Sequence, residues 1–140
     1  MKKVYVYTDG SYRDGVYSGA YLVFDGLYAI YSDAGCGTTA SAIRNVAGEL
    51  SAVMHACRWL ERNNCVGIIV HDYEGISKWL TGEWRCKNDF TKQYYSYMKP
   101  RVDSGLVSFK WVRAHHGDLG NMHADKLARA ALNKQWSWKL

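Results

Sequence analysis

The sequence predicts an α/β fold in which a five-stranded mixed sheet, with three antiparallel strands followed by two parallel ones, carries helices on both faces. Two observations lead to this prediction. The first 31 residues contain three strand-like runs in succession, which is typical of an antiparallel meander. From residue 46 onward, helical and strand-like patterns alternate. Such alternation favours parallel strands with helices packed on the sheet.

The three N-terminal strands are predicted over residues 2–8, 16–24 and 27–31. Along the first run the side chains alternate between two faces, as they do in a strand. Glycine and polar residues over 10–15 predict a loop directly after Asp9, so that Asp9 would end the first strand. The second and third runs meet at an Asp-Gly pair, which is a strong short-range signal for a β-hairpin.

A loop over residues 35–42 should lead into the first long helix. Apolar residues in that helix recur at steps of four, three, four and three, which gives it one buried stripe. The stripe consists of Val46, Leu50, Val53, Cys57 and Leu60. Apolar residues 66–70 then predict a short strand buried on both faces. The other predicted elements are helices over 76–80, 90–98 and 124–132 and a strand over 106–112.

Length and composition indicate one globular domain over residues 1–140. The chain has 48% hydrophobic residues, 22% charged residues and a single proline, which favours a sizeable core over disorder. No apolar run is long enough for a signal peptide or a membrane span. None of the four cysteines has the two-residue spacing of a zinc knuckle or a redox pair, and free thiols are typical of cytoplasmic proteins. We therefore expect a cytoplasmic monomer that does not bind membranes.

The net charge of +5 favours a polyanionic partner, because phosphates attract lysine and arginine and their binding releases counterions. Eight of the cationic residues lie between Ile76 and Arg113, against three acids in the same stretch. A nucleic-acid surface and an ordinary solvated basic face explain this cluster equally well.

Four acidic residues occupy places where catalytic groups often gather. Asp9 follows the first predicted strand, and Asp72 follows the buried strand in the middle of the chain. Glu49 precedes the core residue Leu50 in the long helix, and Asp125 lies near the start of the last helix. If the two strands are neighbours, the four carboxylates converge at the carboxyl ends of the strands, where the sites of α/β sheets form.

Clustered carboxylates need counter-charges, because two of them about 4 Å apart repel by roughly 4 kcal/mol at an effective dielectric of about 20. Two Mg²⁺ ions, with Mn²⁺ as a substitute, would offset this repulsion and could act on a phosphodiester. Four unrelated surface or helix-capping acids would give the same pattern. Zinc fits less well, because His116 and His123 have six residues between them, whereas zinc-finger histidines usually have about three to five.

The most specific segment is residues 110–128, which reads KWVRAHHGDLGNMHADKLA. It resembles the C-terminal signature of type 1 ribonuclease H: a strand, His-x-Gly, a short turn, Asn, and then Ala-Asp-x-Leu-Ala. Residues 7–11, 44–50 and 70–72 are similar to the first, second and third motifs of that family. The matches follow the family order and cover nearly the whole chain, so the resemblance implies an RNase H-like fold.

The resemblance implies an endonuclease that hydrolyses the RNA strand of RNA–DNA hybrids without sequence preference. Two metal ions would carry the reaction, leaving a 3′-hydroxyl and a 5′-phosphate. Asp9 would bridge both ions, and Asp125 would help to hold the ion that activates water. Glu49 and Asp72 would hold the ion at the leaving 3′ oxygen. His115 matches the mobile histidine of the family, which assists proton transfer or product departure.

The resemblance also implies which residues contact the substrate. The backbone around Gly10, together with Asn45, would contact the RNA side of the minor groove, where the 2′-hydroxyl distinguishes RNA from DNA. Trp84 lies where family members contact the DNA strand. Thr39 and Arg44 would bind phosphate, although residues in such a loop often cap the following helix instead. The full implied set is Gly10, Ser11, Thr39, Arg44, Asn45, Trp84 and Asn121.

Three departures from the family pattern bear on function. The long basic, tryptophan-rich insertion after the third acid is missing or shortened, which should weaken hybrid affinity. Met122 stands where many members have glutamate, so one carboxylate fewer lies beside the site. Glu74 stands where a common pattern has an amide, and its carboxylate accepts a hydrogen bond but cannot donate one.

Two other functions are open at this point. A hybrid-binding module without activity would gain nothing from four acids facing phosphates, which argues against it. A resolvase-like nuclease or an integrase core would share the fold, and the segment 110–128 favours ribonuclease H over both.

Overall fold

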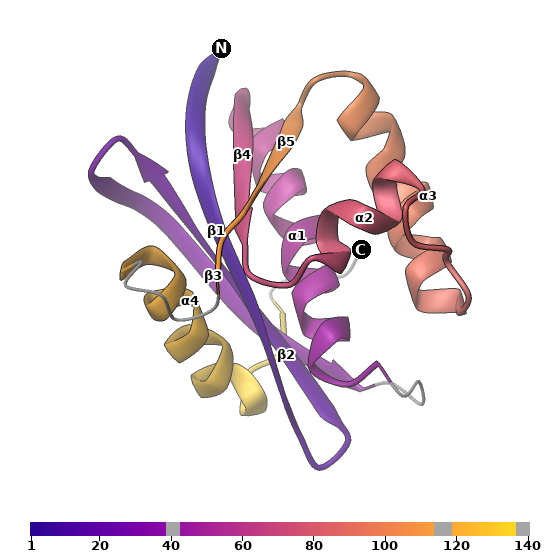
Figure 1. The fold of residues 1–140 in the computed structure, drawn as a ribbon. Helices are drawn as coiled ribbons and strands as arrows, with labels where there is room; N and C mark the ends of the chain where they lie inside the picture. Colours follow the sequence, from indigo (N-terminus) through magenta and orange to yellow (C-terminus); the bar gives the residue numbers. More distant parts are fainter. Residues whose placement is uncertain (39–42, 114–118, 137–140) are drawn as a thin grey trace.

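The computed structural model of this protein describes residues 1–38, 43–113 and 119–136 (Figure 1). Its strands are β1 (Lys2–Arg13), β2 (Val16–Asp25), β3 (Tyr28–Thr38), β4 (Cys65–His71) and β5 (Val107–Trp111). Its helices are α1 (Asn45–Arg62), α2 (Gly75–Thr81), α3 (Asp89–Asp103) and α4 (Leu119–Ala130), and a 3₁₀ turn (Ala131–Asn133) follows α4.

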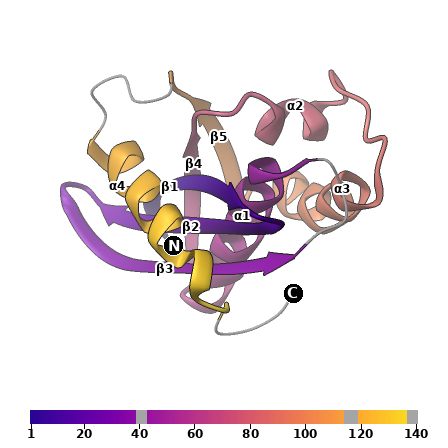
Figure 2. The same cartoon turned by 90° about the horizontal axis from the view of Figure 1, so that it is seen from below.

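The five strands form one mixed sheet in the order β3-β2-β1-β4-β5. β2 is antiparallel to both β1 and β3, whereas β4 is parallel to both β1 and β5. α4 lies on one side of the sheet, and α1, α2 and α3 lie on the other (Figures 1 and 2). The predicted fold class is therefore confirmed.

The two faces of the sheet carry cores of different size. The larger core, on the side of α1, contains aliphatic and aromatic side chains such as Val6, Tyr21 and Met98. The smaller core lies under α4 and consists of buried alanines: Ala20, Ala34, Ala128 and Ala131. Because alanine side chains are short, α4 can lie close to the strands beneath it.

Two glycines allow α1 to cross the sheet at close range. A Cβ atom on Gly48 would clash with the carbonyl of Ser18, and one on Gly19 would clash with the carbonyl of Gly48. The apolar stripe expected for this helix is confirmed, because four of its members are fully buried: Leu50, Val53, Cys57 and Leu60. The close crossing also brings Glu49, the neighbour of Gly48, against the sheet.

The prediction for the end of β1 is wrong. β1 passes Asp9 without ending and stays paired with β2 as far as Arg13, so residues 10–15 do not form a loop. Only Asp14 and Gly15 form the turn, with φ angles of 50° and 83°. Two successive positive φ angles are typical of a tight I′ hairpin, for which an Asp-Gly pair is the usual sequence.

β3 likewise extends into the region predicted as a loop over 35–42. Gly35 and Gly37 lie within the strand because neighbouring rings fill the space that their side chains would occupy. Trp136 packs against Gly35, and Tyr17 packs against Gly37. These glycines therefore mark a close approach of other groups rather than an irregular segment.

α4 begins at Leu119 rather than at residue 124, so Asp125 lies in the middle of the helix and not near its start. Gly120 allows the first turn of the helix to sit directly on the ring of Tyr7. Apolar periodicity predicted only the part of α4 with a buried alanine face, which begins at Ala124.

No helix within the described ranges is both long and apolar enough to cross a membrane. All four cysteines are free thiols, as expected, and Cys36, Cys57 and Cys65 are buried. Burial raises the pKa of the Cys57 thiol, which keeps it protonated.

Candidate active site

Three of the acids predicted as metal ligands lie together at the end of β4. Asp9, Glu49 and Asp72 each offer a carboxylate oxygen, and these oxygens lie within 4.8 Å of one another. The pairing of β1 with β4 ends at Tyr7 and Val70, and β1 then continues beside the chain that leaves β4. Continued in the same register, β1 places Asp9 next to Asp72. The close crossing of α1 adds Glu49 from the helix.

The three carboxyl groups are crowded in a buried place. Asp9 is 7% exposed and Glu49 is 3% exposed. Burial and then the charge of Asp72 raise the pKa of Asp9 to about 7. Burial, followed by the charges of Asp9 and Asp72, raises the pKa of Glu49 well above its usual range. In the absence of a cation, these carboxyl groups therefore hold protons at pH values where exposed carboxyl groups are ionised.

The donor set fits a hard divalent cation. Carboxylate oxygens are the ligands that Mg²⁺ prefers in proteins, and a doubly positive ion would offset the repulsion among them. Among the described residues, Glu49 Oε1 is buried without a hydrogen-bond partner. Asp9 Oδ1 accepts a hydrogen bond from the backbone N–H of Gly10 at 2.9 Å, which orients its carboxylate. The cluster therefore has acceptor capacity that a cation could use.

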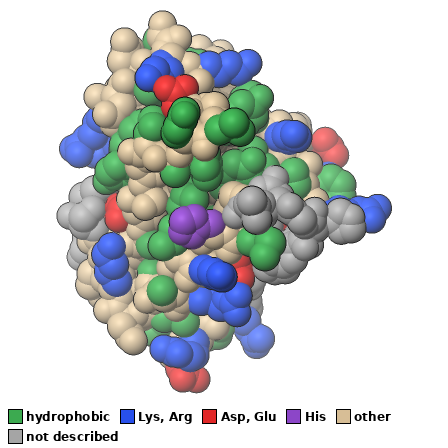
Figure 3. Space-filling model, turned by 90° about the vertical axis from the view of Figure 1, so that its left-hand side faces the viewer, with side chains coloured by type: hydrophobic (Ala, Val, Ile, Leu, Met, Phe, Trp, Pro, Cys, Tyr) green, Lys and Arg blue, Asp and Glu red, His purple; other side chains and the backbone are tan. Residues whose placement is uncertain are grey.

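Asp125 adjoins this cluster from α4. A hydrogen bond with its carboxyl group contributes to the raised pKa of Asp9, so the two side chains are neighbours. Asp125 also forms an ion pair with Arg129, one turn further along the helix. The side chain of Asp125 is 16% exposed and that of Arg129 is 65% exposed. Figure 3 views the side of the molecule on which α4 lies, and Lys and Arg side chains are spread over this face from top to bottom.

The other predicted site residues come from several elements of the fold. Gly10 and Ser11 belong to β1 and pair with β2. Arg44 precedes α1, is exposed, and makes no capping hydrogen bond through its side chain. Two further predictions, Thr39 and His115, lie outside the described residues. Asn45 and Asn121 belong to α1 and α4, but the described part of the structure does not include their side chains.

Trp84 follows α2 and forms an aromatic cluster with Trp79 of that helix and with Tyr73, which precedes it. Its ring lies edge-on to Trp79, with 5.5 Å between centroids, and to Tyr73, with 5.9 Å. Lys78 Nζ lies 5.7 Å from the centroid of the Trp84 ring. An open hollow of about 550 Å³ is lined by Trp79, Trp84, Arg85, Cys86, Lys92 and Tyr95, among others. Aromatic rings beside cations suit a nucleic-acid strand, because bases stack on the rings and phosphates attract the cations.

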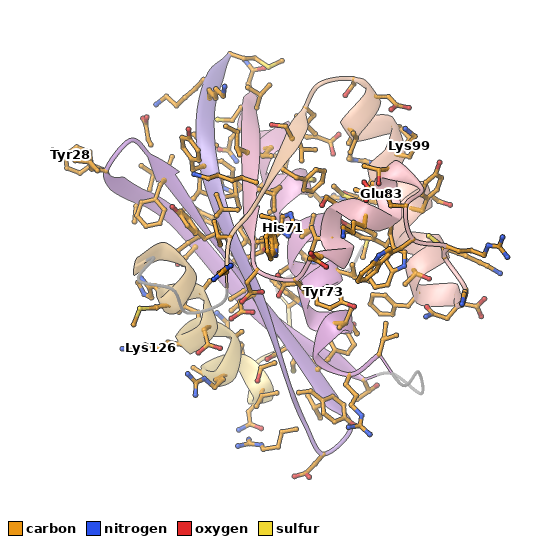
Figure 4. All side chains as sticks on the ribbon, viewed as in Figure 1. Tyr28, His71, Tyr73, Glu83, Lys99 and Lys126 are labelled. Atoms are coloured by element: carbon orange, nitrogen blue, oxygen red, sulfur yellow. The ribbon has the colours of Figure 1, made fainter. Side chains whose placement is uncertain are left out.

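The sequence did not predict that His71 and Trp111 make hydrogen bonds around Asp72. Figure 4 labels His71 and Tyr73, which flank Asp72 in the chain that leaves β4. His71 is fully buried, and its Nδ1 lies 2.8 Å from the carbonyl oxygen of Tyr73. Trp111 Nε1 donates a hydrogen bond to the carbonyl of Asp72 at 2.9 Å. The adjacency of His71 to Asp72 was visible in the sequence, but no local pattern indicates these hydrogen bonds.

Comparisons with known proteins agree with this arrangement. Residues 1–133 match the family model of RNase H. The chain is 31% identical over 144 residues to a ribonuclease H of Campylobacter jejuni, in an alignment that covers 96% of this chain and 94% of that protein.

Two solved structures share the fold. The N-terminal RNase H domain of a Mycobacterium tuberculosis protein has a TM-score of 0.79 at 16% identity, with 94% of each chain covered. LC11-RNase H1, isolated from compost by a metagenomic approach, was solved in complex with an RNA/DNA hybrid and has a TM-score of 0.76 at 17% identity, with 92% of this chain and 96% of that chain covered. The match over residues 1–133 shows that the chain belongs to the RNase H family of ribonucleases.

Proposed function

We propose that the protein is an endonuclease that hydrolyses the RNA strand of RNA–DNA hybrids without sequence preference. The observation that carries this proposal is the group of Asp9, Glu49 and Asp72 at the end of β4, in a chain of the RNase H family. The hybrid bound in a structural neighbour supports the choice of substrate. The products would carry a 3′-hydroxyl and a 5′-phosphate.

The four carboxylates would hold two Mg²⁺ ions, with Mn²⁺ as a substitute. Asp9 is the natural shared ligand, because its pKa responds to Glu49, Asp72 and Asp125. Asp9, Glu49 and Asp72 offer oxygens within 4.8 Å of one another, so these three would hold one ion. Asp9 and Asp125 would then hold the other. When bound, the ions activate a water molecule and stabilise the charge on the leaving 3′ oxygen.

The protein's own groups would control the protons. Only a deprotonated carboxylate is a metal ligand, so Asp9 and Glu49 must lose their protons before they hold a cation. Because the pKa of Asp9 is raised to about 7, cation binding should strengthen as the pH rises through this value. We assign proton transfer at the leaving group to His115, in keeping with its place in the family pattern.

The hybrid would be bound through its backbone and stacked bases rather than through base edges. We assign the RNA strand to the backbone of Gly10 and Ser11 and to Asn45. Phosphate contacts are assigned to Thr39 and Arg44. Two further assignments are Asn121, by its place in the family pattern, and Trp84, whose neighbouring rings and cations suit the DNA strand.

The proposal can be tested with one sequence prepared as RNA–DNA hybrid, double-stranded RNA, double-stranded DNA and single-stranded RNA. Each would be incubated with the protein in Mg²⁺ or Mn²⁺, beside the Asp9→Asn variant. We expect cleavage of the RNA strand in the hybrid alone, with no cleavage by the variant. Extension of the products by a DNA polymerase would identify the 3′-hydroxyl.

Two results would contradict the proposal. Hybrid binding without cleavage in either metal would identify a non-catalytic module. Cleavage of branched DNA, with the hybrid left intact, would identify a resolvase-like nuclease instead.

A further inference from the structure

Where the chain leaves β4, the backbone carbonyl groups of three consecutive residues each accept a hydrogen bond. The His71 carbonyl accepts a hydrogen bond from the N–H of Val112 at 2.8 Å. The Asp72 carbonyl accepts one from Trp111 Nε1 at 2.9 Å. The Tyr73 carbonyl accepts one from His71 Nδ1 at 2.8 Å. The paired strands β4 and β5 end at His71 and Trp111, so two of these three bonds come from side chains at the last pair.

Asp72 needs such support more than the other two acids do. Asp9 lies within a strand and Glu49 within a helix, whereas Asp72 follows the last residue of β4. Asp72 is also the least buried member of the group. The charge of Asp72 acts on both Asp9 and Glu49. Repulsion among the three carboxylates therefore favours outward displacement of Asp72, which lies outside any helix or strand.

Core packing does not explain why positions 111 and 71 carry tryptophan and histidine. Trp111 is 51% exposed, so its ring adds little to the core. His71 is fully buried, and its Nε2 has no hydrogen-bond partner among the described residues. A carbonyl oxygen only accepts, so the His71 proton must be on Nδ1, which leaves Nε2 as an unused acceptor. Leucine would fill this space without burying an unpaired nitrogen, so the bond to Tyr73 is what distinguishes histidine here.

We propose that Trp111 and His71 are positioning residues for the metal centre. By holding the carbonyls of Asp72 and Tyr73, they keep the Asp72 carboxylate beside Asp9 and Glu49 before a cation arrives. In this role they act through the backbone, by hydrogen bonds to carbonyl oxygens, and not as metal ligands. The inference rests on one part of the proposed function, namely that these carboxylates bind a divalent cation.

The variants separate the hydrogen bonds from the packing. Trp111→Phe keeps an aromatic ring and removes the indole N–H. His71→Leu removes the second donor, whereas His71→Asn keeps a side-chain N–H in about the position of Nδ1. Trp59→Phe is the matched control for loss of an indole, because Trp59 stacks on Tyr31 and is not part of the carboxylate cluster.

The measurement is Mn²⁺ binding to the full chain by titration calorimetry, beside the Mg²⁺ concentration that gives half-maximal cleavage of a hybrid. Loss of a group that orients a metal ligand typically weakens affinity about 10- to 100-fold, and we expect about tenfold for Trp111→Phe and for His71→Leu. His71→Asn and Trp59→Phe should stay close to the wild type. Saturating Mg²⁺ should restore cleavage by Trp111→Phe, with an unchanged KM for the hybrid.

An unchanged Mn²⁺ affinity in folded Trp111→Phe would overturn the inference. A loss of cleavage that excess Mg²⁺ does not restore would overturn it as well, because weaker metal binding alone is reversible by mass action. If the wild type binds Mn²⁺ but cuts no hybrid, the proposed function fails, and the affinities of the variants still decide the inference. A wild type that binds no Mn²⁺ contradicts both.

Discussion

Asp72 and Asp125 both adjoin Asp9, but the protein holds them in different ways. The backbone of Asp72 is fastened to Trp111 and lies between two other bonded carbonyls. Asp125 stands on α4, and its side chain pairs with the largely exposed Arg129. An ion pair with an exposed partner is worth at most about 1 kcal/mol and can exchange partners, whereas three hydrogen bonds to consecutive carbonyl groups hold the backbone around Asp72. One side of the site is thus preformed and the other is adjustable.

The two sides also offset the charges of their acids in different ways when no cation is bound. On the preformed side, buried Asp9 and Glu49 lower the repulsion by holding protons, as their raised pKa values indicate. On the adjustable side, Arg129 supplies a positive charge to Asp125. A cation that binds must therefore displace protons on one side and compete with an arginine on the other.

The largest effect should come from Asp9→Asn, because Asp9 belongs to both sides. We expect cleavage to fall by about three orders of magnitude or more, the size of loss typical for a residue that acts in the reaction itself. Hybrid binding in Mg²⁺ should be retained or tightened, since a negative charge that faces phosphates is removed. Single-turnover cleavage and fluorescence anisotropy would measure the two quantities.

Asp103→Asn is the matched control for this experiment, because Asp103 is an exposed acid paired with Lys99 at the end of α3. It should change neither cleavage nor binding. Retained cleavage in Asp9→Asn together with lost binding would rule out a shared metal ligand at this position.

The next largest effect concerns the stability of the metal-free protein against pH. The pKa of Asp9 is raised to about 7 by burial, by Asp72 and by Asp125, while Glu49 and the Gly10 N–H act in the opposite direction. A raised folded-state pKa gives stability that is complete below the unfolded value, near 3.8, and is lost as the pH rises through about 7. At about 1.4 kcal/mol per pKa unit, the loss is at most about 4 kcal/mol.

Thermal unfolding in EDTA between pH 4.5 and 8 would measure this loss. The pKa of His71 is lowered by burial, so His71 has the opposite sign and reduces stability as the pH falls below about 6.5. The difference in unfolding free energy between the wild type and Asp9→Asn gives the contribution of Asp9. This difference should grow as the pH rises. A difference that does not depend on pH would show that Asp9 is ionised throughout this range.

Much of the preformed side follows from the sequence. An acid near the end of the first strand and another after the buried strand 66–70 predicted that Asp9 and Asp72 meet if the two strands are neighbours, and β1 does pair with β4. The stripe of α1 placed Glu49 at the edge of the buried face. The end of β1 was missed because the polar residues after Asp9 suggested a loop, although Asp14 and Gly15 were themselves a hairpin signal.

The remaining details depend on contacts between distant parts of the chain. The hydrogen bond of Trp111 to the Asp72 carbonyl joins residues 39 positions apart, and no local pattern encodes it. Gly35 was assigned to a loop because only the folded protein shows that Trp136 packs on it. The pair of Asp125 and Arg129 is different, since a spacing of four residues on a helix is visible in the sequence and could have been read.

A smaller effect should follow from Arg129→Gln, which removes the competitor for Asp125. We expect the Mg²⁺ concentration for half-maximal cleavage to fall by about threefold, equivalent to roughly 0.7 kcal/mol, within the range of an exposed ion pair. Arg129→Lys keeps the charge and is the control. A requirement for more Mg²⁺ in Arg129→Gln would instead show that Arg129 orients Asp125 for the metal, and the adjustable side would then be preformed as well.

The smallest effect should come from Met122→Glu, which adds a carboxylate to α4 three residues before Asp125. Met122 is 40% exposed, so the change should not disturb the core. The added charge lies on the same helix as Asp125 and should lower the Mg²⁺ optimum by about twofold, or roughly 0.4 kcal/mol. Met122→Gln has the same size without the charge and should leave the Mg²⁺ titration unchanged.

Combining Met122→Glu with Arg129→Gln would sharpen the comparison between the two sides. If Arg129 can turn to the new carboxylate, Met122→Glu has less effect while Arg129 is present and more effect once it is removed. A larger effect of Met122→Glu in the absence of Arg129 would show that the arginine sets the cation affinity of the α4 side. Strict additivity would show that Met122 and Arg129 act on the metal independently, and an unchanged titration in Met122→Glu would mean that this position does not sense the metal.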